Sequence, residues 1–171
     1  DSTRPLTIDP VLNFASYSGS TGNNFGFTAT YDDAGHLYGA GIVFSPGYPT
    51  TTGVLDATYN GIVDPAAPRV DIGVTKWATD GSSLVWSTYI GGNGSDAPHS
   101  MVVNANEELF LFGHTGSGNF PTTPGCFDDQ FHGGPPLAYT IGYGFDQPSG
   151  TDMFVTRLNA AATALIGSTY I

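Results

Sequence analysis

The sequence predicts an all-β protein made of two repeated four-stranded units, and three observations lead to this prediction. Glycine and proline, which punctuate short strands and disfavour long helices, account for 24 and 12 of the 171 residues. Two parts of the chain share the same short motifs in the same order. No apolar stripe at helical spacing persists for three turns, since the alanine-rich stretch from Leu158 to Leu165 is too short.

The internal repeat is the strongest signal in the chain. Segments related by a shift of 72 residues are 12–17 and 84–89, 36–41 and 108–113, and 48–55 and 120–127. Segments related by a shift of 81 residues are 71–77 and 152–158, and 84–90 and 165–171. The change in shift places a nine-residue insertion in the second unit, between Asp128 and Asp152.

The sequence of each unit predicts four strands, because it has four segments that are rich in β-branched and aromatic residues and bounded by turn residues. In the first unit we expect strands near 26–31, 37–43, 71–77 and 84–90. In the second unit we expect strands near 98–103, 108–113, 152–158 and 165–171. Asn, Asp and Gly cluster between paired strands, which predicts hairpin turns. We therefore expect residues 98–113 to form an antiparallel hairpin on which residues 26–43 superpose.

The expected architecture is β-propeller-like. The run Leu109 to Phe112 is apolar on both faces, which is typical of a strand covered on both sides. Four-stranded blades stacked around an axis would cover it in this way. We therefore expect two four-stranded antiparallel blades that form a fragment of a larger propeller or assembly. Because a closed propeller needs about four to eight blades, the outward sheet faces should require cover from further sequence or other chains.

This architecture divides the chain into three parts. The expected parts are a lead-in over 1–11, an outer strand plus the first repeat over 12–97, and a second repeat over 98–171 with its insertion near 129–151. The outer strand is expected over Val11 to Gly19, which matches the fourth strand of a unit. The polar opening Asp1 to Arg4 is not a signal peptide, so the chain is expected to be a mature form or an excised fragment.

Composition argues against several partners. The net charge of −11, from 15 acidic and 4 basic residues, repels phosphate backbones and anionic lipids, so no nucleic-acid partner is expected. The longest apolar run is far short of the roughly 20 residues of a membrane span. The single cysteine, Cys126, permits no disulfide within the chain and no cysteine-based zinc site.

No pattern in the sequence predicts catalysis, a metal site or a cofactor. The four histidines, His36, His99, His114 and His132, lack the spacing of a zinc-binding helix. Cys126 corresponds to Val54, so we expect a buried structural thiol. Neighbouring carboxylates lie in turns, whereas glycosidase chemistry holds its carboxyls across a cleft. We therefore expect a protein that is not an enzyme.

Two residue pairs that coincide between the units predict structural roles. Asp71 and Asp152 each begin a strand, where an aspartate most often accepts hydrogen bonds from turn amides. Lys76 and Arg157 also coincide, which suggests that they act between neighbouring sheets.

The insertion breaks the repeat symmetry. Insertions in repeat proteins map to loops, often on a binding face. Its aromatic rings and carboxylate predict a ligand-binding set made of Tyr139, Tyr143, Phe145 and Asp146. The alternative is that these rings pack on a neighbouring blade or domain. Replacing Tyr139 and Tyr143 with alanine should leave the fold stable and weaken any partner or glycan contact.

Several motifs in order resemble a known family. They are Ser-Thr-Tyr-Ile-Gly-Gly at 87–92, a Gly-Asn-Gly-Ser-Asp turn, Phe-Pro-Thr-Thr-Pro-Gly at 120–125 and Phe-Val-Thr-Arg-Leu-Asn at 154–159. Together they resemble the bacterial SBBP-type β-propeller repeat. The opening of the chain looks like the amino-terminal part of large Bacteroidota surface proteins exported by type IX secretion.

The resemblance implies a non-enzymatic structural or interaction module, at the cell surface or secreted, in adhesion or an extracellular assembly. Expected partners are further repeats of the same protein or other chains of the assembly. The alternatives are a glycan-binding module and part of a propeller enzyme acting on polysaccharide.

Overall fold

The computed structural model describes residue 12 and residues 14–138 and 145–171, and it contains two four-stranded antiparallel sheets. The first sheet consists of β1 (Asn24–Tyr31), β2 (Leu37–Val43), β3 (Asp71–Trp77) and β4 (Leu84–Ile90). The second consists of β5 (Asp96–Val103), β6 (Leu109–Thr115), β9 (Asp152–Leu158) and β10 (Leu165–Tyr170). A small pair, β7 (Leu137–Ala138) and β8 (Asp146–Gln147), lies in the insertion. The eight strands predicted from the repeat are thus confirmed.

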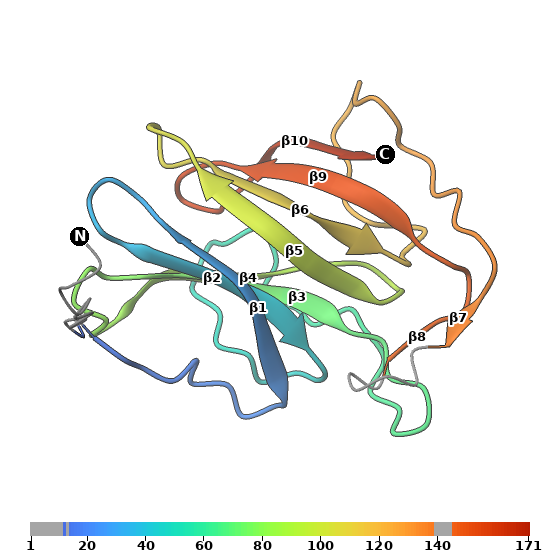
Figure 1. The fold of residues 1–171 in the computed structure, drawn as a ribbon, viewed down its shortest axis with the longest axis horizontal. Helices are drawn as coiled ribbons and strands as arrows, with labels where there is room; N and C mark the ends of the chain where they lie inside the picture. The colour runs from blue at the N-terminus through green and yellow to red at the C-terminus, as the bar shows by residue number, and fades with distance from the viewer. Residues whose placement is uncertain (1–11, 13, 139–144) are drawn as a thin grey trace, which may run out of the picture.

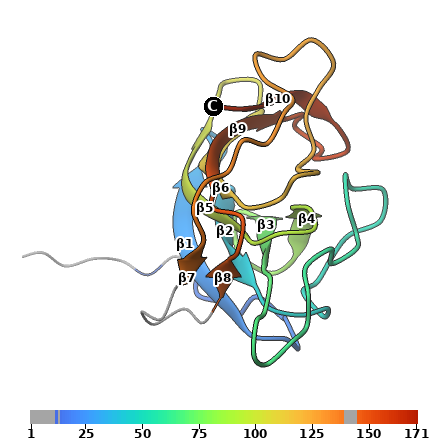
Figure 2. The same ribbon diagram turned by 90° about the vertical axis from the view of Figure 1, so that its right-hand side faces the viewer.

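Both sheets are simple meanders in which each strand pairs with its neighbour in the unit. In Figure 1 the second sheet, coloured yellow to red, lies along one side of the first, coloured blue to green. The first strand of the second sheet, β5, contacts β1, β2 and β3. Figure 2 shows the same stacking from the side. Within the described residues, no helix is long and apolar enough to cross a membrane.

The repeat extends to irregularities of the strand register. The β1–β2 pairing shifts between Gly26 and Thr28, and the β5–β6 pairing shifts between Pro98 and Ser100, which are the equivalent positions. The predicted antiparallel hairpin over 98–113 is confirmed. Because a β-bulge bends its strand and increases the local twist, the two hairpins share a shape as well as a pattern.

A glycine opposite each bulge permits a close backbone approach. A Cβ added at Gly41 would lie 2.0 Å from the carbonyl oxygen of Phe25, and one added at Gly113 would lie 2.2 Å from that of Ala97. These contacts are far below van der Waals distance, so alanine cannot enter either position without a backbone shift.

We predict that Gly113→Ala lowers the free energy of unfolding by about 1–3 kcal/mol, because it forces the bulge to move. Gly118→Ala is the control, since a Cβ there meets nothing within 4 Å. Denaturant unfolding of both variants measures the difference. Equal stability of the two variants would show that the bulge carbonyl does not constrain position 113.

The main core lies between the two sheets. The first sheet contributes Tyr38, Ala40, Ile72, Val74, Trp86 and Ile90, and the second contributes Met101, Leu109, Leu111, Phe154 and Leu158. The Trp86 indole N–H also donates to the carbonyl of Ala160, 2.9 Å away in the turn between β9 and β10. Apolar burial thus joins the sheets into one body through one face of each.

Two sequence-based expectations are corrected. The described residues 14–19 of the expected outer strand form no strand, and the Phe14 ring packs instead against Gly81. A strand requires a paired neighbour, and the described residues provide none for this segment. The run Leu109 to Phe112 is covered on one face only: Leu109 and Leu111 are buried, whereas Phe110 is exposed.

Candidate functional site

The face of the second sheet that points away from the first is apolar and exposed, and we call it the outer face. Its exposed apolar members, with the loop residue beside them, are Val102, Phe110, Met153, Ile166 and Phe127. The first-sheet equivalents of Phe110 and Met153 are Tyr38 and Ile72, both fully buried against the second sheet. The outer face therefore repeats a surface that the molecule elsewhere covers with a sheet.

The loop beside the outer face repeats this relationship. In the first unit, Val54 and Leu55 pack against the core between the sheets, and the Leu55 N–H donates to the Ala162 carbonyl, 2.7 Å away. Their equivalents in the second unit are Cys126 and Phe127. Phe127 is 87% exposed, and both residues border a hollow of about 430 Å³. Exposed apolar patches on other proteins are often interaction sites.

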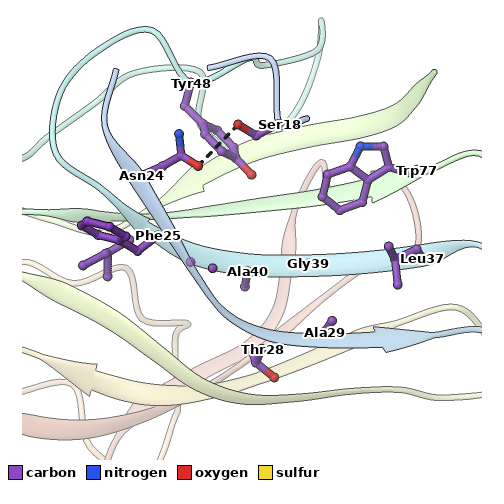
Figure 3. Close-up of a pocket in the computed structure, with 13 residues that line it drawn as sticks. Ser18, Asn24, Phe25, Thr28, Ala29, Leu37, Gly39, Ala40, Tyr48 and Trp77 are labelled. Carbon is purple, nitrogen blue, oxygen red and sulfur yellow. Dashed lines mark hydrogen bonds between the residues drawn. The ribbon is translucent and has the colours of Figure 1, made fainter. Parts of the chain in front are cut away.

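The far face of the first sheet differs from the outer face because its own side chains cover part of it. A Cβ at Gly39 would meet the Trp77 ring at 2.9 Å, and one at Gly73 would meet the Tyr48 ring at 2.7 Å. Figure 3 shows Trp77 and Tyr48 beside the strand that carries Gly39, around a hollow of about 250 Å³. The far face of the first sheet is thus partly covered by aromatic rings of its own unit, whereas the outer face of the second sheet is exposed.

An ion cluster links the two sheets, with Lys76 and Asp32 buried and the Glu107 side chain 47% exposed. The Lys76 ammonium, on a side chain only 3% exposed, lies 3.2 Å from Asp32 and 2.6 Å from Glu107. It also stands over the Tyr38 ring, 5.0 Å from its centre. Burial disfavours the charge of Lys76, but hydrogen bonds with Glu107, Tyr38 and Asp32 raise its pKa overall. The role predicted for Lys76 between the sheets is confirmed.

Arg157, the equivalent of Lys76, lies on the outer face. Its guanidinium stands over the Phe110 ring at 5.2 Å and pairs with Glu108 of its own unit. Its side chain is 36% exposed. Arg157 thus repeats the placement of Lys76 without a second sheet above it.

Two buried carboxylates meet at the link between the sheets. Asp71 and Asp96 are both 0% exposed. A Cβ added at Gly91 would lie 2.6 Å from Asp71 Oδ1 and 2.8 Å from Asp96 Oδ2, so both oxygens border the same small space. Burial raises the pKa of Asp71 to about 7, against the lowering effect of the Asn60 amide, and the charge of Asp96 raises it further.

The surroundings of Asp96 differ from those of Asp71. Burial raises the pKa of Asp96 to about 6, although hydrogen bonds from Thr115, Gly92 and Ser117 oppose the shift. Asp71 Oδ1, in contrast, has no hydrogen-bond partner among the described residues. An ionised Asp71 is therefore poorly compensated.

Asp152, the repeat equivalent of Asp71, has a hydrogen-bond donor for each of its two carboxylate oxygens. Asp152 accepts hydrogen bonds from the backbone N–H groups of His132 at 2.6 Å and Gly133 at 3.0 Å, one on each oxygen. Asp71 accepts from the Asn60 N–H at 2.5 Å. The prediction that both aspartates bond turn amides is confirmed.

The predicted ligand-binding residues do not form one described site. Tyr139 and Tyr143 lie outside the described residues. Phe145 is 3% exposed and packs in a core cluster with Ile42, Val70 and Ala97. Asp146 pairs with Ala138 across β7 and β8, and its carbonyl accepts a hydrogen bond from Ser95. Ligand binding by this set stays a prediction.

Two of the four histidines contact each other, and the other two each contact an aspartate. His36 bonds Asp32, His132 bonds Asp128, and His99 Nε2 lies 2.7 Å from His114 Nδ1 on the second sheet. Over residues 12, 14–138 and 145–171, no group of three or more His, Cys, Asp or Glu side chains could hold a metal ion.

Cys126 is half-buried at the edge of the outer face, rather than buried as expected from its equivalence to Val54. We predict that Cys126→Val changes the free energy of unfolding by less than about 1.5 kcal/mol, as a volume-conserving substitution does. Thermal and denaturant unfolding measure this. A larger loss would show that the thiol makes a specific contact.

No model of a protein family matches this chain, and a search of curated proteins finds no match for it either.

Proposed function

We propose that this chain is a non-enzymatic structural and interaction module: two blades of an SBBP-type propeller array in a secreted or cell-surface bacterial protein, active in adhesion or in an extracellular assembly. Its partners are further sheet repeats of the same protein or other chains that stack on it. The exposure of the outer face carries this proposal, because the equivalent face of the first sheet is buried by a neighbouring sheet.

The chemistry of the exposed surface supports a stacked partner. Phe127, Phe110 and Met153 would gain burial on docking, as their equivalents have done within the chain. Transfer of apolar area from water contributes about 25 cal/mol per Å². A sheet laid on the outer face would also cover the rim of the hollow that Cys126 lines.

The test is a chain extended after Ile171 by a further copy of residues 91–171, with Cys126→Val in the added copy. We call this the extended chain. Docking of the added unit should slow maleimide labelling of Cys126 at least about tenfold, because the thiol becomes accessible only on opening. Phe110→Asp on the outer face is the control and should restore the rate. Unprotected Cys126 in the extended chain would contradict stacking on this face.

Glycan binding is a second candidate function, supported by a hollow beside the insertion. Asp64, Arg69 and Asp146 line this hollow of about 260 Å³ together with apolar residues. Carboxylates and a guanidinium can bond sugar hydroxyls. A glycan array with the whole chain tests it, and Asp146→Ala should weaken any signal. An array without binding would remove this candidate.

A further inference from the structure

We infer that the outer face accepts a sheet unit like the second unit of this chain (residues 91–171), which carries a carboxylate in the turn between its first two strands. We call this the second type. The outer face should discriminate against the first type, a unit like the first unit of this chain (residues 19–90). This inference rests on the proposed function, because it names the partner of the same face. It is drawn from the interface within the chain, where the first sheet already binds such a unit.

The shape of that interface favours the second type. The side chains of Leu111 and Phe154 are fully buried between the sheets. At the equivalent positions the first unit has Gly39 and Gly73. A first-type unit on the outer face would therefore lack two large apolar groups in the centre of the contact. Missing volume in a packed contact costs both apolar transfer and cavity energy.

Aromatic rings of the first unit itself also cover these two glycines. The Trp77 ring lies over Gly39, and the Tyr48 ring lies over Gly73. The Tyr48 hydroxyl is held by Thr75 Oγ1 at 2.6 Å. The first unit thus covers part of the surface that would have to dock, which weighs against its use as the docked unit. A second copy of this chain would present this same surface, so it is not the expected partner.

The charges around Lys76 and Arg157 also favour a second-type unit on the outer face. Lys76 has one carboxylate from its own unit, Asp32, and one from the neighbouring unit, Glu107. Arg157 has one from its own unit, Glu108, and its exposed side faces the position of a neighbour. The carboxylate that is missing around Arg157 corresponds to Glu107. We therefore expect the docked unit to supply it.

Only a second-type unit can supply a carboxylate to Arg157 from this turn position. Glu107 has a φ of 59°, and the equivalent Gly35 has a φ of 90°, so the two residues occupy the same left-handed turn position. Gly35 has no side chain to offer Arg157. A non-glycine residue in this conformation costs stability, and the Lys76–Glu107 ion pair offsets part of that cost.

The test compares extended chains by the maleimide labelling rate of Cys126. The reference adds residues 91–171, and the comparison adds residues 19–90, the first unit; all added units lack cysteine. Protection should be at least about tenfold stronger with the second-type unit. Equal protection by both units would overturn the shape argument while leaving the proposed function in place.

A double-mutant cycle isolates the ion pair. Arg157→Met in the host and Glu107→Gln in the added unit should each reduce protection several-fold, and the two together should reduce it no further than either alone. Glu107→Gln in the host unit, paired with Lys76, is the matched control and should not alter the effect of Arg157→Met. Independent, additive effects would overturn the charge inference. Loss of protection in every extended chain would instead reject the proposed function.

Discussion

Lys76→Met is expected to lower the free energy of unfolding by about 3–5 kcal/mol, the range for removing one partner of a buried ion pair. The substitution keeps the aliphatic stem and removes the ammonium. Asp32, whose side chain is 4% exposed, would then be left buried without its cation, and Glu107 would lose its contact across the sheets. Equilibrium unfolding in urea measures the loss.

The repeat supplies a matched control for this prediction. Arg157→Met removes the equivalent charge from the exposed outer face, where a partly solvated ion pair contributes about 0–1 kcal/mol. Adding Asp32→Asn and Glu107→Gln to Lys76→Met should recover much of the loss, because the uncompensated charges are then gone. Equal losses for Lys76→Met and Arg157→Met would show that burial of the cluster does not determine its contribution.

The second large effect concerns Asp71 and Asp96. Both pKa values are raised in the folded state, to about 7 and about 6, from an ordinary value of 3.8. The folded chain therefore holds protons that the unfolded chain releases. Stability from this pair is fully present below about pH 4 and is lost as pH rises through 6 and 7. Each unit of pKa corresponds to about 1.4 kcal/mol, so the pair makes a contribution of several kcal/mol, part of which is the repulsion between the two charges.

Asp71→Asn should accordingly flatten the pH dependence between about pH 4 and pH 8 and raise stability at pH 8. Asp152→Asn is the control, because its carboxylate accepts a backbone N–H on each oxygen, and it should not raise stability at pH 8. Asp32 acts in the opposite direction at lower pH, since hydrogen bonds that outweigh its burial hold its pKa well below the ordinary value. An unchanged slope in Asp71→Asn would assign the pH dependence to other groups.

Local pattern and repetition were enough to predict the strands. The shift of 72 residues places β1 and β2 on β5 and β6, and the shift of 81 places β3 and β4 on β9 and β10. Strand residues and turn chemistry act over a few neighbours, so a linear pattern records them. The coincidence of Lys76 with Arg157 also predicted a contact between sheets.

The site depends on distances that the linear pattern does not contain. Glu107 reaches Lys76 only because of how the second sheet stacks on the first. Asp71 and Asp96 meet because the chain passes between them at Gly91. Cys126 was expected to be buried, but it is only half-buried, as is its equivalent Val54, because the loop that carries it lies at the edge of its sheet.

The meander topology also determines the order in which the chain can fold during synthesis. Every strand of the first sheet pairs with a strand that has already emerged, so that sheet can form before the second is made. Until β5 and β6 emerge, Tyr38, Ile72 and Val74 remain exposed to water, although they are buried in the finished fold. The interval between the two units is thus when the nascent chain is most prone to aggregate, and slower translation of residues 91–115 should lower the yield of soluble protein.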